Sequence, residues 1–266
     1  MDNENSVIYG LEFQVFHHSD GEIWKITTSP IDPLKLATCY NFVANENSCL
    51  MKTAILKLPE TENPNTIENL EVATKLDTSL FGNDIKTTDF HPTECNKAVS
   101  VTENQIILWD ISGDLAWNID GVHSQLLRDL DYNMNKQYHI ATCGDDGFVK
   151  IWDFRQTIQP VYSRSDHSHW LVSIYVSFAN ANKVLISSAA SVSSENNNET
   201  CVTEENDGLE TKQMLSDGPL QWCEHEDSVY CAEWSPAEPW VFASLSYDGR
   251  LLISRVKKSL KYQIML

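Results

Sequence analysis

The sequence predicts an all-β fold built from a repeated unit. One spacing occurs twice: a histidine is followed after 23 residues by an aspartate, and after 6 more by a residue that closes an apolar segment. The two copies are His123, Asp146 and Trp152, and His225, Asp248 and Ser254. Short apolar segments separated by turn residues surround both copies, as is typical of antiparallel strands. A spacing that recurs within one chain indicates internal repetition.

The copy around Asp146 shows what each unit contains. Residues 138–143 alternate between apolar and polar side chains and end at a Gly-Asp-Asp-Gly sequence, which is typical of a tight turn. Residues 148–152 continue as an apolar strand, and residues 126–133 provide a further strand upstream. Each unit is therefore expected to hold at least three short antiparallel strands.

The length of the unit identifies the type of repeat. Trp109 and Trp152 are 43 residues apart, and His123 and His167 are 44 apart, within the range of roughly 40–45 for a four-stranded propeller blade that ends in Trp-Asp. In these motifs the chain resembles the WD-repeat (WD40) family, whose pattern is a seven-bladed β-propeller.

Weaker copies of the unit occur at three other places. Residues 21–41 keep the opening strands, and residues 85–110 keep the Trp-Asp ending with Glu103 at the position of the turn aspartate. Residues 166–191 have Ala190 at that position, and no third apolar strand is expected after them. About five blades are recognisable, so the sequence predicts an incomplete form of the family propeller.

The WD-repeat resemblance implies a hydrogen-bonded relay in each complete blade. It would join the histidine, a strand Ser or Thr, the turn aspartate and the tryptophan, and hold the loop between blades against the inner strands. Buried polar groups persist when their hydrogen bonds are satisfied, so such a relay has a structural role. The complete set would be His123, Thr142, Asp146 and Trp152, and a partial set would be His225, Ser244 and Asp248.

Two stretches interrupt the pattern inside a single domain that spans residues 1–266. Residues 191–218 carry seven acidic side chains against one lysine, which predicts a disordered acidic loop. Residues 56–83 contain two prolines and several polar residues, which predicts a surface loop. At the two ends, residues 7–13 and 260–266 are strand-like, and we expect them to share a blade that closes the ring.

Composition limits the classes of partner. The 266 residues include 19 basic and 38 acidic side chains, giving a formal charge of −19, which repels nucleic acid and anionic lipid. No apolar run is long enough to cross a membrane, and the first ten residues do not resemble a signal peptide. Seven cysteines without a CxxC pair are expected to be reduced. These features predict a cytoplasmic or nuclear chain without nucleic-acid binding or membrane insertion.

No motif predicts chemistry. The paired histidines at residues 17–18 and 167–169 could be metal ligands, but they fit repeat histidines better because a zinc site needs four convergent ligands. A Ser-His-Asp set could be drawn from Ser244, His225 and Asp248, but it lacks a nucleophile elbow. No phosphate-binding glycine motif occurs. We therefore expect no catalytic residue, metal, cofactor or small-molecule substrate. An enzyme would need convergent ionisable groups in the central channel.

Several longer stretches carry a more specific resemblance. They lie at residues 6–14, 21–30, 38–41, 126–138 and 167–172, and in the segment from His225 to Leu266. In these stretches the chain resembles the WD-repeat proteins that interact with the EARP and GARP complexes. Relative to that family, the chain is shorter after Gln14, between Asp110 and His123, and after Ser191.

This second resemblance implies a role in vesicle traffic. Its members are non-enzymatic partners of the endosome-associated recycling and Golgi-associated retrograde tethering complexes. They act in endosomal recycling, retrograde transport and dense-core vesicle formation, peripherally at the trans-Golgi network and endosomes. The alternative is a general WD-repeat scaffold of another assembly, such as a ubiquitin-ligase receptor or chromatin adaptor. Neither reading identifies the residues that bind a partner.

Overall fold

The computed structural model describes most of the chain between residues 14 and 256. The described ranges are 14–45, 48–59, 67–82, 84–165, 170–176, 183–189, 200–204, 220–222, 225, 227–235, 237–238 and 240–256. Every regular element in these ranges is a β-strand, which confirms the all-β prediction. None of the described residues forms a helix that could cross a membrane.

The strands form five blade-like sheets and one two-stranded pair. The first sheet contains β2 (Ile23–Thr28), β3 (Lys35–Asn45), β4 (Ser48–Lys57) and β6 (Glu71–Leu76). The second contains β7 (Ile85–Phe90), β8 (Lys97–Thr102), β9 (Gln105–Asp110) and β10 (Leu115–Ile119). The third contains β11 (Leu127–Tyr132), β12 (His139–Gly144), β13 (Val149–Asp153) and β14 (Tyr162–Arg164).

The chain continues with two further sheets. The fourth contains β15 (Trp170–Val176), β16 (Lys183–Ala189), β17 (Thr200–Glu204) and β18 (Leu220–Trp222). The fifth contains three described strands, β19 (Val229–Trp234), β20 (Val241–Ser246) and β21 (Leu251–Arg255). Outside these sheets, β1 (Phe16–His17) pairs in parallel with β5 (Glu68–Asn69).

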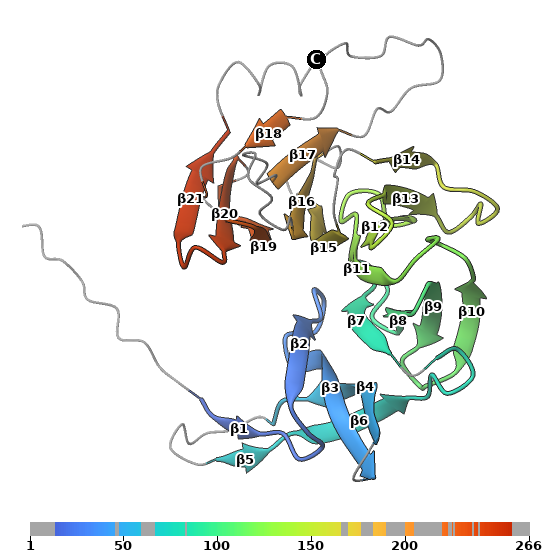
Figure 1. Cartoon of the computed structure of the whole chain (residues 1–266). Helices are drawn as coiled ribbons and strands as arrows, with labels where there is room; N and C mark the ends of the chain where they lie inside the picture. The colour runs from blue at the N-terminus through green and yellow to red at the C-terminus, as the bar shows by residue number, and fades with distance from the viewer. Residues whose placement is uncertain are drawn as a thin grey trace, which may run out of the picture.

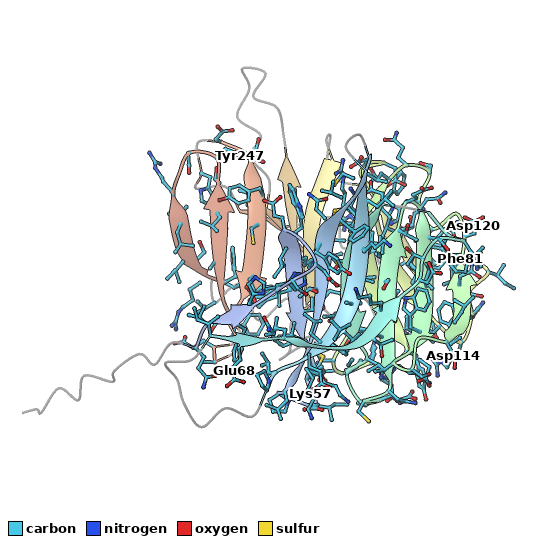
Figure 2. The ribbon with its side chains drawn as sticks, turned by 90° about the horizontal axis from the view of Figure 1, so that it is seen from below. Lys57, Glu68, Phe81, Asp114, Asp120 and Tyr247 are labelled. Carbon is cyan, nitrogen blue, oxygen red and sulfur yellow. The ribbon has the colours of Figure 1, made fainter. Side chains whose placement is uncertain are left out.

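The five sheets are arranged as propeller blades around a common centre, each with its first strand innermost (Figure 1). Within every blade successive strands are antiparallel neighbours. Seen from the side, the relay loops near Asp120 and Tyr247 lie toward one face, and Lys57 and Asp114 lie toward the other (Figure 2). We call these the relay face and the opposite face. The innermost strands run from the relay face to the opposite face.

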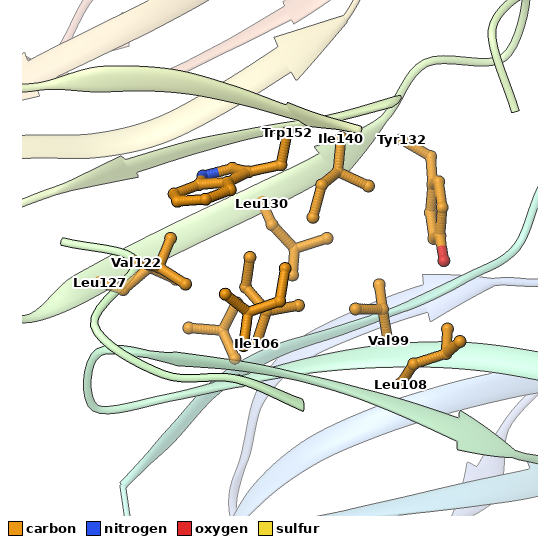
Figure 3. Close-up of a cluster of buried hydrophobic side chains, with 11 residues drawn as sticks. Val99, Ile106, Leu108, Val122, Leu127, Leu130, Tyr132, Ile140 and Trp152 are labelled. Carbon is orange, nitrogen blue, oxygen red and sulfur yellow. The ribbon is translucent and has the colours of Figure 1, made fainter. Parts of the chain in front are cut away.

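Apolar side chains between neighbouring blades form the core. Val99, Ile106 and Leu108 of the second blade pack against Leu130 and Trp152 of the third (Figure 3). A second cluster joins the first blade to the second in the same way and includes Ile55, Leu76, Phe90, Ile107 and Trp109. Burying one large apolar side chain contributes about 1.5–3 kcal/mol. Each blade therefore gains much of its stability from its neighbours.

Strands occur in both segments that the sequence assigns to loops. Residues 56–83 include the end of β4 together with β5 and β6, and β6 pairs with residues 53–57. Residues 191–218 include β17, which pairs with β16. Outer strands need backbone hydrogen bonds but bury little apolar surface, as the mostly exposed residues of β6 show. For this reason the apolar pattern misses them.

The prediction that no third strand follows residues 166–191 is therefore wrong. β17 and β18 complete a four-stranded fourth blade. The remaining residues of the predicted acidic loop, the repeat position His167, and the end segments 7–13 and 260–266 lie outside the described residues. Disorder of the acidic loop and closure of the ring by the ends remain predictions.

The turn before β2 supplies a stability test. Gly21 has a φ of 137°, and a Cβ atom at this position would lie 1.8 Å from the carbonyl oxygen of Asn41. We expect Gly21→Ala to lower the free energy of unfolding by at least about 2 kcal/mol, because both the backbone and the contact are unfavourable. Gly121→Ala is the control, since Gly121 also has a positive φ, of 66°, but has open space around it. Urea unfolding of both variants would contradict this account if the losses were equal.

Candidate functional site

The third blade brings His123, Thr142, Asp146 and Trp152 into one hydrogen-bonded set. His123 Nδ1 lies 2.8 Å from Asp146 Oδ1, and His123 Nε2 lies 3.0 Å from Thr142 Oγ1. Trp152 Nε1 donates to the same Thr142 hydroxyl over 3.3 Å. His123 and Thr142 are almost completely buried. The set connects the loop before β11 to β12, β13 and the turn between them.

Asp146 joins the loop before β11 to the turn between β12 and β13. Its carboxylate accepts hydrogen bonds from the backbone N–H groups of Ser124, at 3.0 Å, and Phe148, at 3.1 Å. Burial raises the pKa of Asp146. The hydrogen bond and charge interaction with His123 and the backbone N–H groups have the larger, opposite effect, so the pKa is lowered to about 2. The ionised carboxylate is therefore the form that the fold stabilises.

The fifth blade brings together the partial set. His225 Nε2 lies 2.8 Å from Ser244 Oγ, and His225 Nδ1 lies 3.4 Å from Asp248 Oδ2. Ser254 is buried in the position that Trp152 occupies in the third blade, opposite Phe242 of the neighbouring strand. Without an indole N–H, this set has one donor fewer than that of the third blade.

A Ser-His-Asp order in the fifth blade does not make a hydrolase site. Ser244 is only 4 % exposed. A catalytic serine needs a cavity that admits the substrate and donors that stabilise an oxyanion. Ser244 instead lies within the sheet, where its hydroxyl contacts the His225 ring. The geometry supports a structural role.

Two further polar sets occur. The sequence predicts that His18 is a repeat histidine but does not identify its partner, and the set in the second blade was missed. In the first blade His18 Nε2 lies 3.3 Å from Thr38 Oγ1. The 20 residues between them nearly match the 19 that separate His123 from Thr142, so the spacing could have identified this pair. The second blade contains a hydrogen-bonded set that has no histidine. In it Trp109 Nε1 donates to Ser100 Oγ over 3.0 Å, and Ser100 Oγ lies 2.8 Å from Thr88 Oγ1.

A cavity of about 360 Å³ lies where the innermost strands of all five blades meet. Its wall includes Lys25, Thr87, Asp89, Asp131, Glu233 and Trp234. Several wall residues end or follow the innermost strands, so the cavity lies toward the opposite face. Ionisable groups therefore converge in the channel. The described residues contain no group of three or more His, Cys, Asp or Glu side chains that could hold a metal ion.

An ion pair crosses this channel. Lys25 Nζ of the first blade donates to Asp129 Oδ1 of the third, and the backbone N–H of Ile174 in the fourth donates to Asp129 Oδ2 over 3.3 Å. Burial lowers the pKa of Lys25, but the charges of Asp129, Asp89 and Asp131 raise it above the ordinary value of a lysine. The buried carboxylate of Asp129 therefore joins the third blade both to the fourth, its neighbour in sequence, and to the first, which is not a neighbour.

Asp89 occupies an electrostatically unfavourable position in the channel. Burial raises its pKa to about 6, and the nearby charge of Asp129 acts in the same direction. Backbone N–H groups of Phe90 and Tyr132 and the charge of Lys25 oppose this increase. At neutral pH the folded protein holds an Asp89 carboxylate that would be more stable in water.

The fold and the relays define a WD-repeat β-propeller. The WD40 (WD domain, G-beta repeat) family model matches residues 115–153 and 219–253. The chain belongs, more specifically, to the family of EARP and GARP complex-interacting proteins. It is 33 % identical to human EARP and GARP complex-interacting protein 1 over 344 aligned residues, which cover 100 % of this chain and 88 % of the relative.

Other relatives support the same assignment. The rat protein of that name is 32 % identical over 345 residues, covering 100 % of this chain and 88 % of the relative. EARP-interacting protein 1 of Caenorhabditis elegans is 33 % identical and covers 90 % of this chain and 70 % of the relative. These values place the whole described propeller within one family.

The alignment length can be compared with the length of the repeated unit. The rat alignment spans 345 positions, while this chain contributes 266 residues, which leaves at least 79 positions of the relative without a counterpart. About two units of 40–45 residues would fill that difference. The structure describes five blades, and the seven-bladed pattern of the family stays a prediction.

Removing the Asp146 carboxylate tests the relay. We expect Asp146→Ala to lower the free energy of unfolding by about 1–3 kcal/mol at pH 7, because buried partners lose their acceptor. Glu71 is exposed on β6, so Glu71→Ala is expected to change stability by less than about 0.5 kcal/mol. Similar melting temperatures of the two variants would contradict a structural relay.

The stability difference between wild type and Asp146→Ala is expected to depend on pH. The lowered pKa of Asp146 means that its electrostatic contribution is complete above pH 4 or so, where the unfolded carboxyl is also ionised, and is lost as the pH falls toward about 2. The stability difference between wild type and Asp146→Ala should therefore shrink over that range. Urea unfolding at several acidic pH values measures it, and a constant difference would argue against the ionised form.

Asp89 is expected to behave in the opposite way. Because its folded pKa is raised, protonation below about pH 6 stabilises the folded state, and ionisation at neutral pH destabilises it. We expect Asp89→Asn to raise the free energy of unfolding at pH 7 by about 1–3 kcal/mol and to have little effect at pH 4. Thermal unfolding at both pH values measures this. A variant less stable than wild type at pH 7 would show that the carboxylate is stabilised.

Proposed function

We propose that this chain is a non-enzymatic adaptor that binds subunits of the EARP and GARP tethering complexes. The observation that carries the proposal is sequence identity of 32–33 % over the whole chain to relatives named for interaction with those complexes. The five described blades present loops and sheet edges to which a partner protein could bind. Their relays stabilise those loops without exposing a nucleophile.

The cellular role is a second part of the proposal. We infer that the chain supports endosomal recycling, retrograde vesicle transport and dense-core vesicle formation. It would act in the cytoplasm and peripherally at the trans-Golgi network and endosomes, through contacts with proteins instead of lipid. A charge of −19 supports this choice, because it opposes direct binding to anionic lipid and nucleic acid.

The ionisable groups in the channel bear on the alternative of an enzyme. Lys25 is held by Asp129, and Asp89 accepts backbone hydrogen bonds, so neither is arranged as a nucleophile with an adjacent base. The cavity wall instead combines carboxylates with threonine and apolar side chains. This composition supports binding more than bond breaking.

Affinity purification tests the assignment. We expect the tagged chain to recover tethering-complex subunits from cytosol, as identified by mass spectrometry. An untagged human relative added in excess should compete for them. A tagged, unrelated WD-repeat propeller serves as the control. Recovery of ubiquitin-ligase or chromatin subunits in place of tethering subunits would favour the general scaffold and contradict the proposal.

A further inference from the structure

Three innermost strands carry a carboxylate at the same structural position. Asp89, Asp131 and Glu233 are each the last residue but one of β7, β11 or β19. They lie opposite Val99, Ala141 and Ala243 of the neighbouring strands, so their registers are equivalent. Repetition of the unit therefore places three carboxylates at one level of the channel.

All three residues belong to the wall of the central cavity. They differ in exposure: Asp89 and Asp131 are half-buried, and Glu233 is exposed. A partner group entering from solvent would meet Glu233 first and the more buried carboxylates afterwards. The volume of about 360 Å³ admits one long side chain of a partner, although not a folded element.

Acidic side chains outnumber basic ones among the described residues of the cavity wall. Three of these residues are carboxylates, Asp89, Asp131 and Glu233, and one is basic, Lys25. Lys25 already pairs with Asp129, which lies behind the wall. Narrow clefts lined by one sign of charge concentrate ligands of the opposite sign. The cavity is thus suited to a cation.

An unsatisfied hydroxyl in the same wall supports a polar occupant. Thr87 lies two residues before Asp89 on β7 and is 0 % exposed. Its Oγ1 atom has no hydrogen-bond partner among the described residues, although a buried hydroxyl ordinarily has one. A ligand with several N–H donors would provide the missing hydrogen bond. Guanidinium and ammonium groups have such donors.

We propose that the channel cavity binds a basic side chain, arginine or lysine, inserted by a peptide segment of a partner protein. Asp89 and Asp131 would accept charge-assisted hydrogen bonds, Thr87 would accept another, and Glu233 would attract the cation at the entrance. This site concerns the chemistry of the inserted group and does not depend on which complex the chain joins.

Asp89→Asn can separate an effect on binding from an effect on folding. A carboxylate that weakens the fold at neutral pH is typical of binding sites, where function opposes stability. Asp89→Asn should retain a stable fold while losing the charge that holds the cation. Weaker binding by this variant could not then be attributed to unfolding, and thermal melting of each sample verifies this.

Isothermal titration with two short peptides measures the site. The probes are acetyl-Gly-Ala-Arg-Ala-Gly-amide and the same peptide with Gln in place of Arg, each titrated into the full chain at low salt. We expect the Arg peptide to bind at least about ten-fold more tightly than the Gln peptide. A ten-fold ratio corresponds to the free energy of roughly one charge-assisted hydrogen bond. Equal dissociation constants for the two peptides would overturn the proposal.

Matched variants locate the site in the channel. Asp89→Asn and Asp131→Asn should each weaken binding of the Arg peptide by about ten-fold. Glu71→Gln removes one negative charge from the outer strand β6 and should change binding by less than about two-fold. Equal losses in all three variants would mean that net charge alone attracts the peptide, and would overturn the channel site.

A final arm separates a partner segment from a free cation. Spermidine carries ammonium groups without a peptide backbone, so it should compete weakly with the Arg peptide. Spermidine that binds more tightly than the peptide, with the same dependence on Asp89, would show that the cavity takes small polycations and would overturn the partner-segment proposal.

Discussion

Every other feature of this protein depends on the need of each sheet to cover both faces. A three- or four-stranded sheet with apolar side chains on its two faces cannot bury them by itself. In this chain the cover comes from the next blade, as Val99 and Leu108 against Leu130 and Trp152 illustrate. A radial arrangement follows, because blades that stack face to face while their first strands converge must radiate from a centre. The channel is the place where this packing ends.

Polar interactions then determine how the blades are positioned. Apolar stacking is not directional, so it permits sliding of one sheet over another. The His123–Asp146 contact holds the entering loop of the third blade to its own turn, at the relay face. The Lys25–Asp129 pair acts across the channel and joins the first and third blades, which are not neighbours in sequence. The side chains of His123, Asp146 and Asp129 are buried. Losing the partner of one of them leaves a buried polar group unsatisfied, so alternative arrangements of the blades become costly.

How much was predictable depends on where a residue lies in the blade. The spacing of His123, Asp146 and Trp152 predicted the propeller, and β11, β12 and β13 lie within two residues of the expected strands. Outer strands such as β6 and β17 were missed because their stability comes from backbone pairing and needs no apolar pattern. The channel site was missed for another reason. Asp89, Asp131 and Glu233 are far apart in sequence, and only the convergence of three blades brings them to one cavity.

The pKa of Asp146 is lowered and that of Asp89 is raised, so turn positions and channel positions differ in their effect on stability. Asp146 lies at a turn where backbone N–H groups and His123 stabilise its charge, so ionisation strengthens the fold. Asp89 lies on an innermost strand whose channel edge has no further strand beside it, so burial there is not offset to the same extent. Relay positions are thereby constrained by stability. Channel positions can carry a carboxylate at a cost in stability that a bound cation would offset.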